Sequence, residues 1–237
     1  FKNKIIYKVY DEIPNKIEEI NDKDDESTKS GKYIMNAVYR ENGQRNFIMS
    51  GLKEANDEDI ILISDVDEIP NLSEIKIKSI KEKIILFKQD MFYYKFNLKL
   101  PDMEWTGTKA CKKKNLLNPQ WLRNIKDRKY PIYRIDVLFS EKKYIDVKII
   151  NNGGWHFSNI KSPDKIEHKL KSYLHHRDFD VENIDLKEIS KLMRNNETIY
   201  DMFADKREKK FSENKRKLNL YPKDKLPQYI LGNESKF

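Results

Sequence analysis

One short segment constrains this chain more than any other: an apolar run at residues 60–64 ends abruptly in acidic residues and a proline. The run, Ile-Ile-Leu-Ile-Ser, has the composition of a strand buried on both faces, as in a parallel sheet covered by helices. Open α/β sheets bind ligands in the crevice beyond the carboxyl ends of their strands. Asp65, Asp67 and Glu68 follow the run directly, so we predict that these three side chains carry the catalysis.

The spacing of the two aspartates suits a divalent cation. In an extended chain the side chains at positions i and i+2 point the same way, so Asp65 and Asp67 can face one ion together. Hard oxygen ligands fit Mg²⁺ or Mn²⁺, which often bind through one or two carboxylates and the phosphates of a substrate. The alternative is a solvated acidic turn after a core strand. The third acid, Glu68, and the stop at Pro70 favour the functional interpretation.

Size and charge bound the remaining possibilities. A chain of 237 residues is most simply one domain, residues 1–237, and its 11% aromatic content argues against disorder. A net charge of +8 could attract a nucleic acid, an acidic membrane surface or an anionic small substrate. Only 9 of the 47 basic residues are arginine, which bidentate recognition of bases favours, so we expect no nucleic-acid partner. No apolar stretch approaches membrane-spanning length.

The periodicity of the rest predicts an α/β sandwich in which helices and strands are mixed. Helical spacing or start signals indicate helices at residues 33–52, 72–83, 119–125, 162–175 and 183–194. Strand-like runs occupy residues 4–9, 60–64, 84–88, 92–98 and 144–150. Residues 22–30 are polar and acidic, which is typical of a loop.

Residues 153–158, Gly-Gly-Trp-His-Phe-Ser, form a second unusual segment. Its glycines permit positive φ or a close approach of backbone. His156 could bind a metal through a neutral imidazole nitrogen, but a buried histidine bonded to a backbone carbonyl fits the residues equally well. Trp155, like Trp105, could pack on the face of a sugar, and packing in the core is the equal alternative for both.

Several segments in a fixed order together resemble glycosyltransferase family 17. This is the family of β-1,4-mannosyl-glycoprotein β-1,4-N-acetylglucosaminyltransferase, the bisecting GlcNAc enzyme, and its bacterial and viral relatives. The segments that carry the resemblance are residues 40–48, 59–70, 105–108, 122–123, 153–158, 169–176 and 226–231. No single segment is decisive, and the ordered set is specific.

The resemblance implies a GT-A-like, Rossmann-like fold with a mixed, mostly parallel central sheet and flanking helices. It implies metal-dependent, inverting transfer of a sugar, with GlcNAc expected, from a UDP-sugar to a glycan or glycoconjugate acceptor. The metal, Mn²⁺ or Mg²⁺, would be held by Asp65, Asp67 and His156. The residues expected at the donor are Arg45, Asn46, Trp105, Gly107, Trp155 and Lys169. For Arg45 and Lys169 the alternative is an exposed, solvated cation.

The chain also departs from the pattern of the family. The family usually opens with a strand-helix-strand unit that carries an Asn-Glu-Leu segment, so we expect this chain to lack that N-terminal unit. A cytoplasmic location in a bacterium or a virus-infected cell is a further expectation. The general base that inversion requires stays open among Glu68, Glu104 and Asp178.

Two other functions remain open on the sequence alone. The first is an Asp-x-Asp metal-dependent phosphatase or phosphotransferase with Asp65 as nucleophile. That class usually has Thr or Val two residues past the second aspartate, where this chain has Ile69. The second is a non-catalytic basic binding module, which would cluster arginines and aromatics, whereas lysine is spread throughout this chain.

Overall fold

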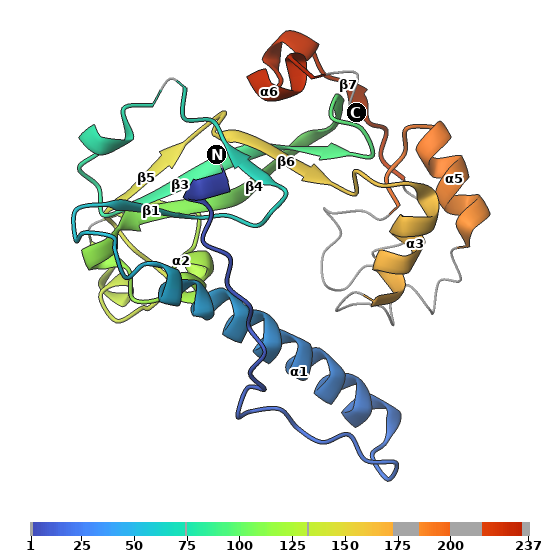
Figure 1. Cartoon of the computed structure of the whole chain (residues 1–237), viewed down its shortest axis with the longest axis horizontal. Coiled ribbons are helices and arrows are strands. Elements are labelled where there is room, and N and C mark those ends of the chain that lie inside the picture. The colour runs from blue at the N-terminus through green and yellow to red at the C-terminus, as the bar shows by residue number, and fades with distance from the viewer. Residues whose placement is uncertain (1, 74, 132, 173–184, 200–214, 234–237) are drawn as a thin grey trace. The chain divides into compact units, whose positions relative to one another are not determined.

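A computed structural model of the chain describes residues 2–73, 75–131, 133–172, 185–199 and 215–233. Over these ranges the protein is an α/β structure with a mixed sheet in the strand order β1-β4-β3-β6-β2 (Figure 1). Two further strands lie off this path, β5 beside β3 and β7 beside β4. The strands are β1 (Ile60–Ile63), β2 (Glu68–Pro70), β3 (Ile84–Tyr93), β4 (Leu98–Lys112), β5 (Val147–Ile150), β6 (Gly154–Ser158) and β7 (Asn219–Leu220).

Among the described α-helices, the first has 22 residues and the others have 10 or fewer. The α-helices are α1 (Glu26–Phe47), α2 (Pro119–Asn124), α3 (Pro163–Ser172), α5 (Leu186–Arg194) and α6 (Gln228–Leu231). Short 3-10 helices are η1 (Lys2–Lys4), η2 (Ile48–Gly51), η3 (Ile77–Ser79), η4 (Lys113–Asn115), η5 (Ile135–Val137) and η6 (Lys223–Lys225). No helix in the described ranges has the length and apolarity that crossing a membrane requires.

The chain divides into two compact units, and each is described separately. Unit 1 contains residues 1–63, 81–85 and 109–148. Unit 2 contains residues 64–80, 86–108 and 149–237.

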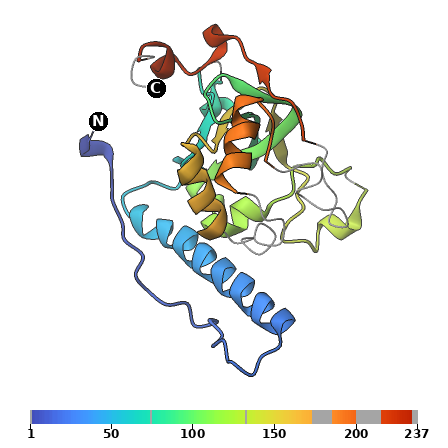
Figure 2. The same cartoon turned by 90° about the vertical axis from the view of Figure 1, so that its right-hand side faces the viewer.

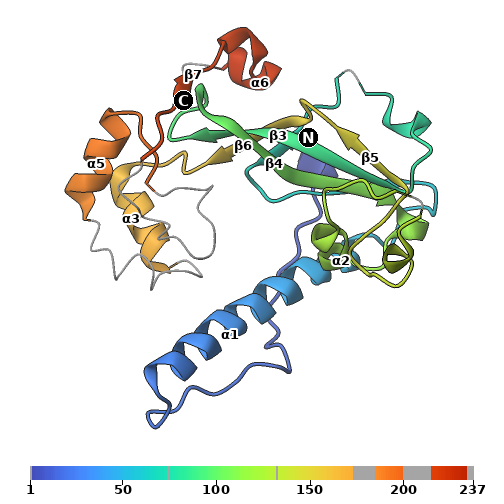
Figure 3. The ribbon, with the colours of Figure 1, turned by 180° about the vertical axis from the view of Figure 1, so that it is seen from behind.

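Unit 1 carries the long helix α1. Its N-cap is Asp25, whose carboxylate accepts the Thr28 N–H at 2.7 Å. The helix α2 starts at Pro119 as the sequence predicts, and its N-cap is Asn118. The C-terminal end of α1 contacts α2 (Figure 3). Strand β1 pairs antiparallel with β4, from Ile60 opposite Lys112 to Ile63 opposite Lys109.

Unit 2 holds the parallel pair β3 and β6 and the antiparallel pair β2 and β6. Helices α3 and α5 lie side by side (Figure 2). Their apolar side chains pack with those of β3 and β4 in one core cluster, whose members include Met91, Leu100, Ile166, Leu170, Ile189 and Leu192. A second cluster joins Phe92 and Phe157 to Leu226 and Ile230, near the end of the described chain.

Several predictions at the ends of unit 1 and in its edge strand need correction. Residues 4–9 are not a strand: Lys4 ends η1, and residues 5–9 have no regular structure. The expected loop at residues 22–30 gives way to helix from Glu26, because Asp25 caps it, and the expected helix 33–52 lies mostly in α1. The strand at residues 60–64 is confirmed, but it lies at the edge of the sheet, and its neighbour is antiparallel.

In the rest of the chain, the structure corrects one predicted helix, the length of one strand and the direction of strand pairing. Residues 72–83 contain only η3 in the described part, so the predicted helix is wrong. The strand at 84–88 continues to Tyr93, and the chain then turns at Tyr94, whose φ is 62°, into β4. The mixed sheet is confirmed: β3–β6 is parallel, while β1–β4, β2–β6 and β4–β7 are antiparallel.

The late helices agree with the sequence within the described ranges. Helix α3 begins at Pro163 as predicted, and residues 173–175 lie outside the described part. Helix α5 ends at Arg194 as predicted, and its N-cap is Asp185. The strand at residues 144–150 is confirmed as β5, which begins at Val147.

Candidate functional site

The acidic segment after β1 is a tight turn fastened by Glu68. The Glu68 N–H donates to the Asp65 carbonyl at 3.0 Å, and the Asp65 N–H donates to Glu68 Oε2 at 3.0 Å. The other carboxylate oxygen, Oε1, accepts the indole N–H of Trp105 at 2.8 Å. Glu68 is only 4% exposed, whereas Val66 at the tip of the turn is fully exposed. The Glu68 carboxylate therefore shapes the turn that presents Val66 and Asp67.

Asp67 lies beside His156. Strand β2 pairs with β6 so that Glu68 is opposite His156, and the Phe157 N–H donates to the Asp67 carbonyl at 2.8 Å. This register brings His156 Nε2 to 3.4 Å from Asp67 Oδ2. The His156 side chain is 11% exposed and lies against the Trp105 indole, with ring centroids 5.3 Å apart.

The interaction with His156 favours the charged form of Asp67. Burial of the Asp67 carboxyl is the largest effect and opposes ionisation. The hydrogen bond and attraction to His156, with smaller effects of a backbone hydrogen bond and of Lys169, outweigh burial, so the pKa of Asp67 is lowered. Asp67 is thus an ionised carboxylate whose side chain keeps 34% of its surface exposed.

A buried polar network lies next to Glu68. A Cβ on Gly107 would come within 1.8 Å of Gln89 Oε1 and 2.9 Å of Glu68 Cδ. Gln89 in turn bonds Thr108 Oγ1 at 3.3 Å, and that hydroxyl lies 2.6 Å from Ser64 Oγ. Glycine at 107 therefore leaves the room that the Glu68 carboxylate and the Gln89 amide occupy.

Lys169 brings a cation to the same side of unit 2. Its Nζ donates to Asn159 Oδ1 at 2.9 Å. Asn159 directly follows β6, adopts a left-handed conformation with φ of 54°, and is only 3% exposed. Burial lowers the pKa of Lys169, and the negative charge of Asp67 partly offsets that effect. Lys169 and Asp67 both belong to unit 2, and the negative charge of Asp67 acts on Lys169.

Asp67 also lies on the wall of an open cavity of about 900 Å³. The size is typical of sites for small molecules and cofactors. Its lining contains the exposed lysines Lys95, Lys161 and Lys223. The other lining residues, most of them apolar or aromatic, are Val66, Ile69, Tyr94, Phe96, Asn97, Phe157, Ile160, Leu226 and Ile230. A carboxylate, several cations and apolar walls together suit a ligand that carries both an anionic group and a flat or apolar part.

The remaining predicted donor residues are Trp155 in unit 2 and Arg45 and Asn46 in unit 1. Trp155 neighbours His156 on β6, so the two side chains point to opposite faces. Trp155 packs against the cluster of Phe157, Leu226 and Ile230, which line the cavity, and its indole donates to the Lys225 carbonyl at 3.1 Å. Arg45 and Asn46 belong to unit 1, where Arg45 bonds the Gln120 side chain and Asn46 Oδ1 accepts the Gln120 N–H. Donor binding by these three residues stays a prediction.

The expected metal ligands are brought together in part. Asp67 and His156 are neighbours, and Asp65 precedes them in the same turn. Within the ranges that the structure describes, no three His, Cys, Asp or Glu side chains form a ready cluster for a metal ion.

Sequence reasoning missed Asn159, Gln89 and the cavity wall from Leu226 to Ile230. The signal for Asn159 was present, because asparagine at the end of a strand often takes a left-handed turn. The contacts of Gln89 and of residues 226–230 join segments far apart in the chain, so no local pattern reports them. The late histidines, His175 and His176, and Asp178 lie outside the described residues.

A comparison with protein-family models identifies one match: the model described as Glycosyltransferase family 17 covers residues 3–237 of this chain. A comparison with curated proteins gives no significant match. A comparison with solved structures gives none either.

Proposed function

Because this chain belongs to glycosyltransferase family 17, we propose that it transfers GlcNAc with inversion from a UDP-sugar to a glycan acceptor, assisted by Mn²⁺ or Mg²⁺. Family membership supports sugar transfer in general. The observation that carries the finer proposal is the position of Asp67, an ionised carboxylate between His156 and a cavity of about 900 Å³.

The residues fit a divalent cation that shares its ligands with a substrate. Asp67 would hold the ion, with Asp65 from the same turn and His156 through the Nε2 that faces Asp67. Mg²⁺ and similar ions often take only one or two protein carboxylates and complete their shell with phosphates and water, so a ready cluster of three ligands is not required. When bound, the ion would neutralise charge on the departing diphosphate.

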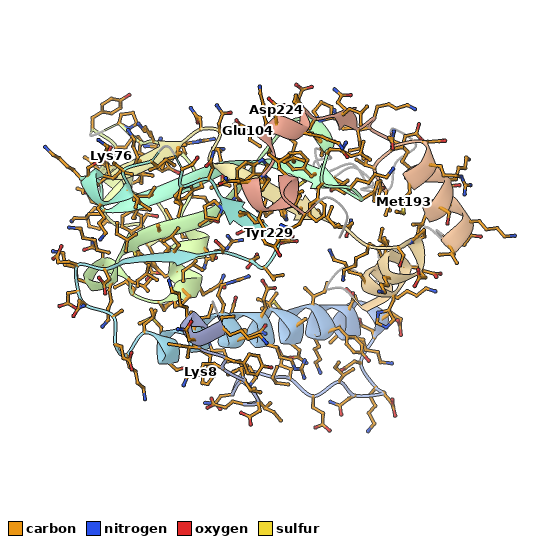
Figure 4. All side chains as sticks on the ribbon, turned by 45° about the horizontal axis from the view of Figure 1, so that its top comes forward. Lys8, Lys76, Glu104, Met193, Asp224 and Tyr229 are labelled. Carbon is orange, nitrogen blue, oxygen red and sulfur yellow. The ribbon has the colours of Figure 1, made fainter. Side chains whose placement is uncertain are left out.

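The neighbouring side chains would support that role without touching the reacting atoms. Lys169, held by Asn159, adds a positive charge on the side of the site where a diphosphate would lie beside Asp67. Glu68 is best assigned as a positioning residue, because both of its carboxylate oxygens accept hydrogen bonds within the protein. Among the acids considered for the general base, Glu104 is exposed on β4 (Figure 4) and Asp178 lies outside the described residues.

Calorimetric titration of UDP, with and without Mn²⁺, tests the proposal. We expect UDP to bind at least about tenfold more tightly with Mn²⁺, a difference of about 1.4 kcal/mol. Asp67→Asn should remove this gain, because the neutral amide is a poor ligand for a hard cation. Asp102→Asn is the matched control: Asp102 is exposed, and its φ of 58° is one that asparagine also adopts readily. Equal affinity for UDP with and without the metal would contradict the proposal.

Substrate tests separate this function from the two rivals. A phosphatase of the Asp-x-Asp class would release inorganic phosphate from a simple phosphomonoester and depend on Asp65. A basic binding module would turn over neither substrate. Release of UDP from a UDP-sugar, without release of phosphate from the monoester, is the result that the proposed function predicts.

A further inference from the structure

A loop in unit 1 is closed at its neck. The Lys126 N–H donates to the Lys142 carbonyl at 2.7 Å, so the two ends of the segment 126–142 lie together. Compact surface loops with adjoining ends are packed by their own side chains and are frequently functional. We call residues 126–142 the neck-closed loop; residue 132 within it lies outside the described part.

Internal contacts give the neck-closed loop a defined shape. Helix η5 turns its tip, and the Leu138 N–H donates to the Ile135 carbonyl at 3.0 Å. Val137 is 5% exposed and anchors the turn. The Asp136 carboxylate accepts from the Arg134 guanidinium at 2.6 and 2.8 Å and from Lys143 Nζ at 2.9 Å. These contacts fix which side chains the tip presents outward.

The outward side chains at the tip are large and apolar. Their exposed fractions are 81% for Tyr133, 68% for Ile135, 74% for Leu138 and 86% for Phe139. Single exposed apolar residues are ordinary, but several together on one surface mark a site of interaction. Glycosyl transfer as proposed above uses none of them, since Asp67 and the cavity belong to unit 2.

The charge of the same loop indicates what covers the apolar tip. Residues 126–142 contain five basic and three acidic residues, and Lys143 follows them directly. Lys126, Arg128, Lys129 and Lys142, near the neck, are exposed. An apolar tip framed by cations is the pattern of segments that lie in the interface of an anionic bilayer. A second copy of the chain would bring the same net positive loop against itself, and like charges oppose that contact.

We propose that the neck-closed loop binds an anionic lipid surface. Tyr133, Ile135, Leu138 and Phe139 insert among the headgroups, and the lysines and arginines of the neck contact the lipid phosphates. The loop would thereby hold the protein at a membrane without a spanning helix.

Co-sedimentation with vesicles of phosphatidylcholine, with and without phosphatidylserine, tests this. We expect the whole chain to bind the anionic vesicles, and to bind them less as salt is raised. The double variant Leu138→Ser, Phe139→Ser should weaken binding at least about tenfold, because it removes most of the apolar surface of the tip. Arg128→Gln with Lys129→Gln should weaken it by about fivefold per residue. Leu117→Ser, at a residue 68% exposed outside the loop, is the matched control and should bind like the wild type.

Two results would overturn the proposal. If the serine double variant binds as well as the wild type, the general charge of +8 rather than the loop attracts the vesicles. If no vesicle is bound, and gel filtration shows a dimer for the wild type and a monomer for the double variant, the tip binds a second copy of the chain. Circular dichroism of each variant checks that the fold is intact.

Discussion

At the scale of single residues, the acidic motif separates into two roles that the sequence presents as one. Asp67 is ionised and lies at the cavity wall, whereas Glu68 is buried and fastens the turn. The sequence could place all three acids at the end of a strand because the apolar run is local. The sequence could not assign them different roles, because the indole of Trp105 that binds Glu68 lies 37 residues away in the chain.

The role of Glu68 predicts a loss of stability rather than a loss of a proton-transfer group. Glu68→Gln replaces one accepting oxygen by an amide N–H₂, which would face the N–H of Asp65 or of Trp105. A buried donor left without an acceptor costs about 1–3 kcal/mol. Urea unfolding followed by tryptophan fluorescence measures the difference.

Glu104→Gln is the control for that experiment, since Glu104 is exposed on β4 and its substitution should change stability by less than about 0.5 kcal/mol. If Glu68→Gln unfolds at the same urea concentration as the wild type, the Glu68 carboxylate does not fasten the turn.

At the scale of elements, the local patterns of residues 119–125, 162–175 and 183–194 were enough to predict α2, α3 and α5. Strand β4 was missed, because Pro101 and Gly107 both disfavour the interior of a strand. Strand β6 was missed because its Gly153-Gly154 start reads as a turn. Gly154 has a φ of 136°, and a Cβ there would come within 2.1 Å of the Ile69 carbonyl oxygen.

Gly107 makes the packing inside β4 testable. Gly107→Ala would place a methyl group 1.8 Å from Gln89 Oε1 and close to Glu68, so both side chains must move. Overpacking of this kind costs about 1–3 kcal/mol of unfolding free energy. The loss should appear in urea unfolding and should be accompanied by weaker UDP binding, since Glu68 shapes the turn that presents Asp67.

Gly31→Ala in α1 is the matched control, because a Cβ at that position meets nothing within 4 Å. Alanine inside a helix should stabilise the protein by about 0.5–1 kcal/mol. The packing argument fails if the two alanine variants change stability in the same direction.

At the scale of the whole molecule, the ordered set of short segments identified the family. The directions in which the strands of the sheet pair were harder to predict. Direction of strand pairing depends on connections between distant segments, and an apolar run such as residues 60–64 fits an edge strand as well as a central one. The polar and apolar residues of the cavity come from four separated stretches of the chain. Its existence therefore follows from the fold and from no single motif.

The most direct test of the account is the release of UDP from UDP-GlcNAc, measured for the wild type and for Asp67→Asn with Mn²⁺ or with a chelator. We predict release by the wild type with Mn²⁺, its loss with the chelator, and a fall of about a hundredfold or more in kcat/KM for Asp67→Asn. Asp102→Asn should match the wild type. Turnover by Asp67→Asn at the wild-type rate, or turnover that the chelator leaves unchanged, would contradict the central claim that Asp67 serves metal-dependent sugar transfer.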